Sequence, residues 1–139
     1  MEPPLKVGQL AEATSVPAKT IRYYEQVGVL PAAQRSAAGY RQYLRRDVER
    51  LLFVRRARTL GLSLSQVRDL TGELEGNRCV TMRPRLHRFV ADQLLVVEQR
   101  IAEFRVLERQ LTDVLRRLEN SAVRPDGKGC RCLDGVNRN

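Results

Sequence analysis

Apolar residues recur at helical spacing near the start of the chain. Val7, Leu10 and Ala11 lie three and one residues apart, which predicts a short helix over residues 6–13. Residues 14–16 are then expected to form a turn. A second apolar and polar pattern begins directly after this turn, so the two segments together predict a pair of short helices joined by a tight turn.

The second segment, residues 16–28, predicts a basic amphipathic helix. Pro17 suits a first helical position, because its missing N–H would be unpaired there, and Gly28 suits the end. Ile21 and Val27 form the apolar side. The polar side carries donors that suit phosphates and base edges, namely Lys19, Thr20, Arg22, Tyr23 and Tyr24. A helix-turn-helix uses such a second helix in the DNA major groove, although any exposed amphipathic helix carries some Lys and Arg.

Residues 30–43 predict a β-hairpin. Ser36–Gly39 is a suitable turn, since Gly39 accepts a positive φ. The two arms carry cations and phenols that could contact a DNA backbone as a wing, namely Arg35, Tyr40, Arg41 and Tyr43. The alternative is an ordinary solvated loop.

Two further helices complete an N-terminal module. The first is predicted over residues 46–60, with a core face of Val48, Leu51, Leu52, Val54 and Leu60. Ser63 and Gln66 have the spacing of a capping box, which opens a helix that ends near Gly72. Residues 1–72 therefore predict a compact winged helix-turn-helix domain.

A connector over residues 73–80 precedes a long helix over 81–120, which Thr81 can cap and which tolerates Pro84 in its first turn. Its apolar positions follow a spacing of 3.5 residues, interrupted by Glu108: Val90, Leu94, Val97, Ile101, Phe104, Leu111, Leu115 and Leu118. The helix would be about 58 Å long at 1.5 Å per residue, and it needs a partner to cover this seam. The predicted fold is all-α with a small β-hairpin wing, and the helix is interpreted as an antiparallel coiled coil in a homodimer. The charged flanks do not settle the direction.

Charge supports a polyanionic partner. The 139 residues carry a net charge of +9, and residues 1–70 contribute a surplus of +6. Nucleic acid is favoured over membrane, because no segment is both basic and continuously apolar. No signal peptide is recognised, so a cytoplasmic, nucleoid-associated protein is expected.

The chain has few residues that could carry out catalysis, but it has three thiols that could bind a metal. It has one histidine, no paired-carboxylate site and no nucleophile beside a base, so an enzyme is rejected. Cys79, Cys130 and Cys132 are an odd number and do not form a disulfide framework. They are either small hydrophobes or thiolate ligands. Residues 121–139, which hold two of them, predict a C-terminal loop and tail. His87 is expected to be a surface or packing residue.

Several motifs make the chain resemble the MerR family of transcription regulators. They are Thr20-Ile21-Arg22-Tyr23-Tyr24-Glu25 with Gly28, Gly39-Tyr40-Arg41-Gln42-Tyr43, Asp47-Val48-Glu49-Arg50-Leu51 and Gly61-Leu62-Ser63-Leu64. The resemblance implies a dimer on double-stranded promoter DNA with a long spacer. Effector binding would bend and underwind that spacer so that RNA polymerase can use it, at a cost of a few kcal/mol.

The resemblance to metal-sensing members implies an effector site at the cysteines. Cys79 matches the cysteine near the start of the dimer helix, and Cys130 matches the second cysteine of the loop that follows. The first loop cysteine of that pattern is missing, and Cys132 is additional. Three thiolates shared across the dimer suit a soft divalent metal such as Hg²⁺, Pb²⁺, Cd²⁺ or, with a fourth ligand, Zn²⁺.

Three other interpretations stay open. A Cu-responsive regulator is one, although a cysteine at position 79 goes with divalent metals in this family. A redox-responsive regulator with a [2Fe–2S] cluster is the second, but two loop cysteines cannot supply four ligands. A coiled-coil adaptor that binds no DNA is the third, and it would leave the basic helix and hairpin without a role.

Overall fold

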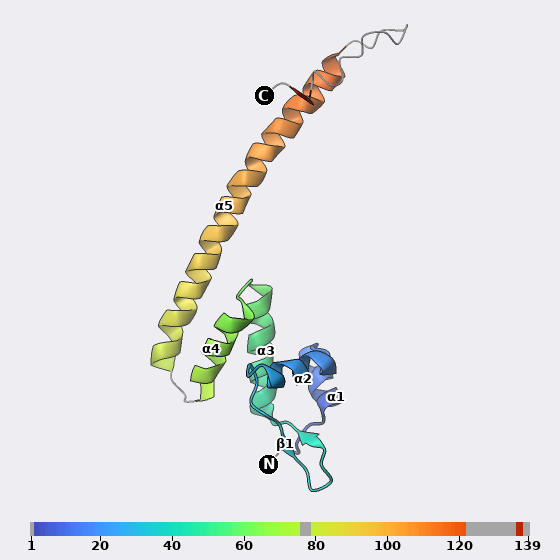
Figure 1. Cartoon of the computed structure of the whole chain (residues 1–139), viewed down its shortest axis with the longest axis vertical. Coiled ribbons are helices and arrows are strands. Elements are labelled where there is room, and N and C mark those ends of the chain that lie inside the picture. The colour runs from blue at the N-terminus through green and yellow to red at the C-terminus, as the bar shows by residue number, and fades with distance from the viewer. Residues whose placement is uncertain (1, 76–78, 122–135, 138–139) are drawn as a thin grey trace. The chain divides into compact units, whose positions relative to one another are not determined.

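The computed structural model describes residues 2–75, 79–121 and 136–137 (Figure 1). The elements, in chain order, are α1 (Val7–Thr14), α2 (Ala18–Gln26), β1 (Gln34–Arg35), β2 (Arg41–Gln42), α3 (Arg45–Thr59), α4 (Leu64–Glu75) and α5 (Cys79–Asn120). The predicted fold class, mainly helical with a small hairpin and a long C-terminal helix, is confirmed.

The hairpin has the predicted turn. Gly39 has a φ of +85° and donates its N–H to Ser36 O at 2.9 Å. The two strands pair antiparallel, with Arg35 opposite Arg41. The pairing continues beyond β2, because Leu5 and Tyr43 exchange backbone hydrogen bonds of 2.7 and 2.9 Å. The segment before α1 therefore anchors the hairpin, a contact that the local sequence pattern did not predict.

The core lies among the first four helices. Its fully buried members include Leu10 of α1, Ile21 of α2, Leu51 and Val54 of α3, and Leu70 of α4. Helix α1 contacts both α2 and α3, and α3 contacts α4. One face of each helix is thus covered by its neighbours, which is what the amphipathic patterns require.

Helix α3 uses a narrower core face than predicted. Leu51, Val54 and Ala57 are buried, but Leu52 and Leu60 are 41% and 47% exposed. Leu52 follows Leu51 by 100° around the helix, which turns it away from the core. The expectation that Leu52 and Leu60 belong to the core is therefore wrong.

The predicted capping box at the start of α4 is confirmed. Ser63 N donates to Gln66 Oε1 at 2.8 Å, and Gln66 N donates to Ser63 Oγ at 3.1 Å. Each side chain satisfies a backbone N–H that has no partner within the helix.

Several predicted boundaries are corrected. Pro17 precedes α2 as its N-cap residue, with ψ of 143°, and is not the first helical residue. Helix α4 continues through the expected connector as far as Glu75, and α5 begins at Cys79. Thr81 is therefore inside α5, and Pro84 lies in its second turn, where the helix forgoes one N–H donor close to its N-terminus.

The chain divides into two compact units, residues 1–94 and 95–139. The first unit exceeds the expected domain of residues 1–72, because Met82, Leu86 and Phe89 pack against the core. Two further contacts join α5 to the same unit. Arg85 donates to Glu73 Oε1 at 2.8 Å, and Gln93 lies against Gly61, whose φ is +91°.

No residue of α5 is buried in the single chain. All eight apolar positions of its predicted seam are exposed, from 39% at Leu118 to 65% at Phe104. None of the helices described is long and apolar enough to cross a membrane. The seam of α5 is thus an uncovered apolar stripe, and further apolar side chains, among them Leu95 and Leu107, are exposed beside it.

Adjacent leucines in α3 test the position of the core. We expect Leu51→Ala to lower the free energy of unfolding by about 2–5 kcal/mol, because it leaves a cavity at a fully buried site. Leu52→Ala, at an exposed site, is the control and should cost less than about 1 kcal/mol. Urea unfolding at one fixed protein concentration measures both, and equal losses would contradict this description of α3.

Candidate nucleic-acid interface and metal site

Helix α2 presents a basic outer face. Ile21 is fully buried and holds the helix against the core, whereas Lys19, Arg22 and Tyr23 are exposed. Thr20 and Tyr24 are partly buried at the edges of this face. The side chains that the sequence singled out are therefore on the outside of α2, where a polyanion can reach Lys19, Arg22 and Tyr23.

The hairpin carries a second group of exposed donors. Tyr40 is 71% exposed, and Arg35 is also exposed. Arg35 Nη1 donates to Gly39 O at 2.8 Å and so closes the turn on itself. Arg41 is half-buried, with 35% of its side chain exposed. The hairpin thus combines one free phenol with two arginines that are already held in place.

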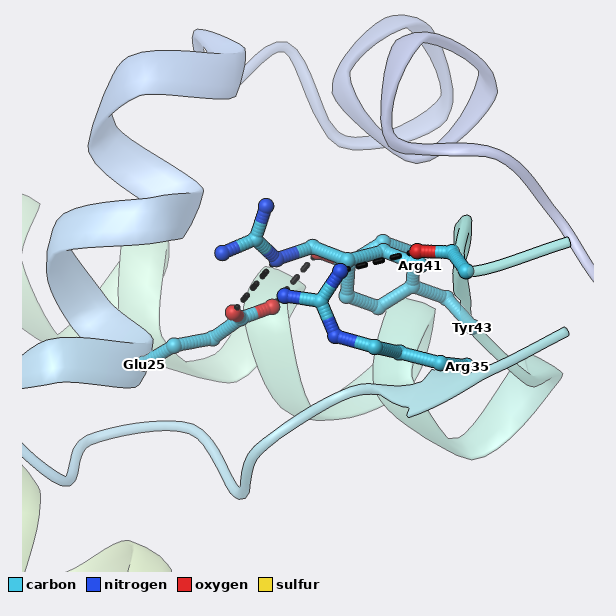
Figure 2. Close-up of polar contacts among 5 residues, drawn as sticks. Glu25, Arg35, Arg41 and Tyr43 are labelled. Atoms are coloured by element: carbon cyan, nitrogen blue, oxygen red, sulfur yellow. Dashed lines mark hydrogen bonds and ion pairs between the residues drawn. The ribbon is translucent and has the colours of Figure 1, made fainter.

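Glu25 joins α2 to the hairpin. Its carboxylate accepts hydrogen bonds from Tyr43 Oη at 2.5 Å and from Arg41 Nε at 3.2 Å, and its side chain is only 10% exposed. Figure 2 shows that Arg41 reaches this carboxylate through its Nε. Glu25 therefore uses one edge of the guanidinium and leaves the other edge available to an anion.

Tyr43 does not face outward as expected. It is 2% exposed, and its ring belongs to the core. Burial raises the pKa of Tyr43 well above its ordinary value, and the hydrogen bond to Glu25 adds to the effect. The sequence-based assignment of Tyr43 to DNA contact is corrected: its hydroxyl holds Glu25, because the strand pairing with Leu5 turns its side chain inward.

Glu25 itself was not assigned a role from the sequence. Glu25 is the one acidic residue in the basic segment 16–28, and this was the only sign in the sequence that it has a special role. Its partners lie 16 and 18 residues further along the chain, so the local pattern could not identify them.

The three cysteines fall partly outside the described residues. Cys79 is exposed and is the first residue of α5, whereas Cys130 and Cys132 lie in the segment that is not described. Within residues 2–75, 79–121 and 136–137, no group of three His, Cys, Asp or Glu side chains could hold a metal ion. His87 is exposed and borders a shallow hollow with Cys79, Arg83 and Pro84.

The Tyr43 hydroxyl can be removed without removing its ring. We expect Tyr43→Phe to lower the free energy of unfolding by about 1.5–3 kcal/mol, because a nearly buried carboxylate loses a donor. Tyr40→Phe, at an exposed site, is the control and should stay within about 0.5 kcal/mol. Urea unfolding measures both changes.

Alkaline titration adds a second readout. Because the pKa of Tyr43 is raised in the folded state, its contribution to the free energy of unfolding is complete below pH 10.0 and is lost progressively above it. Tyr43→Phe should lack that alkaline loss, and an unaltered profile would contradict the assignment.

Two protein families match the chain. Residues 5–74 match "MerR HTH family regulatory protein", and residues 48–114 match "MerR, DNA binding". The matched residues include α2, the hairpin and most of α5.

Curated relatives and solved structures agree with this match. The mercuric resistance operon regulatory protein of Bacillus cereus is 32% identical over 81% of this chain and 83% of its own length. The transcriptional regulator ZntR of Escherichia coli K12 is 36% identical over 76% of this chain and 74% of its own length. The regulator PbrR691 of Ralstonia metallidurans CH34, in complex with lead(II), covers 95% of this chain and 98% of its own, with 28% identity and a TM-score of 0.67.

A structure with DNA is also similar. HiNmlR, a MerR family regulator lacking the sensor domain and bound to promoter DNA, covers 86% of this chain and 97% of its own, with 25% identity and a TM-score of 0.55. These relatives are transcriptional regulators and not enzymes. The matches over both the N-terminal helices and α5 therefore place this chain in the MerR family of helix-turn-helix regulatory proteins.

Proposed function

We propose that the chain is a metal-responsive regulator that binds double-stranded promoter DNA as a homodimer and activates transcription when a soft divalent metal binds. The observation that carries the DNA-binding part is the combination of exposed Lys19, Arg22 and Tyr23 on α2 with an Arg41 held by Glu25. The DNA-bound relative supports the same part of the proposal.

In this proposal α2 enters the major groove and the hairpin lies along the backbone. Helix α2 offers exposed cations and a phenol from a face that the core keeps rigid, which suits contact with base edges and phosphates. Arg41 and Tyr40 would contact phosphates beside it. Because Glu25 ties β2 to α2, both groups of donors meet the DNA at a fixed separation, so little ordering is left to occur on binding.

The dimer would form through α5. Its exposed apolar stripe is typical of a coiled-coil seam and would be covered by a second copy of the helix. Two copies of α2 then bind the two halves of a pseudo-palindromic site. Metal binding would change the separation of these halves and distort the spacer for RNA polymerase, at a deformation cost of a few kcal/mol.

The metal would be Hg²⁺, Pb²⁺, Cd²⁺ or Zn²⁺, held by Cys79 together with Cys130 and Cys132. Thiolate sulfur is a ligand that these metals prefer, and the side chain of Cys79 is exposed at the start of α5, where a ligand can reach it. The mercuric resistance regulator and the lead(II) complex among the relatives support this choice. When bound, the metal would supply a crosslink between the thiolates that favours one arrangement of the dimer.

The DNA-binding part can be tested by salt dependence. A duplex selected from a random library by the wild-type protein serves as the probe. We expect Arg22→Ala and Arg41→Ala each to weaken binding and to reduce the slope of log K against log salt by about one unit per lost phosphate contact. Arg109→Ala, which removes the same charge from an exposed position of α5, should leave the slope unchanged. An unchanged affinity and slope in the double variant would refute the interface.

The metal site can be tested by equilibrium titration against a competing thiol. We expect Cys79→Ser, Cys130→Ser and Cys132→Ser each to weaken binding of the effective metal by at least about tenfold, because each removes a thiolate ligand. The ultraviolet absorption of the metal–thiolate bonds gives a readout independent of transcription. His87→Ala is the control and should bind normally. Wild-type affinity in all three serine variants would rule out this site.

A further inference from the structure

A largely buried carboxylate lies at the end of α4. Glu73 is in the last turn of this helix, and its side chain is only 18% exposed. Arg85 of α5 donates its Nη1 to Glu73 Oε1 at 2.8 Å. The other oxygen, Oε2, is buried and has no hydrogen-bond partner, the one such side-chain atom in the described part of the chain.

This position is unfavourable for a carboxylate in three respects. Burial removes water from the charge of Glu73, and Oε2 has no donor that replaces this water. The C-terminal end of a helix also carries a partial negative charge, which repels an acidic side chain. Departures of this kind from local rules are expected where a residue serves function rather than stability.

The ion pair belongs to a junction of few contacts between α5 and the helices before it. Three apolar side chains pack against the core from one face of α5, namely Met82, Leu86 and Phe89. Further along the helix, Gln93 lies against Gly61. Hydrophobic contacts have no preferred direction, whereas a guanidinium binds a carboxylate in a defined geometry. Among the described residues, Arg85 and Glu73 form the one ion pair across this junction.

We propose that the ion pair between Glu73 and Arg85 fixes the angle between α5 and the DNA-binding helices, and so determines the spacing of the two half-sites that the protein recognises. This inference rests on the homodimer of the proposed function. In that dimer each DNA-binding domain is carried by its own α5, so a rotation at the junction moves one copy of α2 relative to the other. Glu73 and Arg85 are thus positioning residues that do not contact DNA.

The geometry of DNA makes the angle at this junction important. Adjacent base pairs are about 3.4 Å apart along the axis and are rotated by about 35°. A half-site moved by one base pair is therefore both displaced and turned. A domain held at a fixed angle meets only one such position with all its donors, whereas a domain that pivots at the junction accepts neighbouring positions with similar affinity.

The two partners differ in how their loss affects stability. Arg85 is 48% exposed, so water can solvate its charge when the carboxylate is removed. Glu73 has little such access, and loss of Arg85 leaves a buried carboxylate without a cation. We therefore expect Arg85→Met to lower the midpoint of urea unfolding, and Glu73→Gln to leave it nearly unchanged. Both variants should nevertheless lose the fixed spacing, which separates the positioning role from a purely structural one.

A series of duplexes tests the proposal with the full-length chain. The duplex selected by the wild-type protein is lengthened or shortened by one base pair between its half-sites. We expect this change to weaken wild-type binding by about tenfold or more, but binding of Glu73→Gln and Arg85→Met by no more than about threefold. Arg85→Lys keeps the cation and should restore most of the preference. Arg88→Met removes the same charge from an exposed position of α5, and should match the wild type.

Each other outcome has a definite meaning. A wild-type spacing preference that persists in both variants would overturn the role of the ion pair, and Glu73→Gln alone decides this if Arg85→Met fails to fold. A dimer whose wild-type form binds all spacings equally would overturn this inference and leave the proposed function intact. Sedimentation of the wild-type protein on the selected duplex distinguishes that case from a monomer, which would refute the proposed homodimer and this inference with it.

Discussion

A single carboxylate, that of Glu25, links the basic face of α2 to the hairpin. Glu25 lies on α2, the helix that carries the exposed cations, yet both of its partners belong to the hairpin side of the domain. This contact adds a direct link between α2 and the hairpin to the backbone pairing of Leu5 with Tyr43 and the burial of the Tyr43 ring in the core. So short a hairpin has little stability of its own and depends on such contacts. The acidic residue in a basic helix therefore has a structural role, which is to hold Arg41 of the hairpin beside that helix.

Much of the fold was predictable because its signals are local. The capping box at Ser63 and the turn at Gly39 each depend on residues within a few positions, and the structure confirms both. The seam of α5 was predicted from the 3.5-residue spacing of its apolar residues alone. The failures concern long-range contacts. Tyr43 and Tyr40 look alike in the sequence, and only pairing with Leu5 decides that Tyr43 is buried. Leu52 resembles Leu51 in the same way, and the position of neighbouring helices decides which of them enters the core.

The same distinction between local signals and long-range contacts applies to the candidate sites. The donors of α2 could be named from the sequence because an amphipathic helix exposes its polar face, and the structure places Lys19, Arg22 and Tyr23 there. The role of Glu25 could not be named, since it requires knowing which residues lie across the domain. The cysteines were found by residue type and by resemblance, and only Cys79 lies among the described residues. Their joint action remains a proposal.

Gly61 lies where the turn between α3 and α4 contacts α5. Its φ of +91° lets the chain turn sharply between α3 and α4, and its missing side chain leaves the space that Gln93 occupies. A Cβ at this position would overlap the Gln93 amide, so the end of this side chain from α5 occupies the space that a larger residue would need. In the proposed regulator, Gly61 is thus the point at which the turn between α3 and α4 meets a side chain of α5 without a side chain of its own.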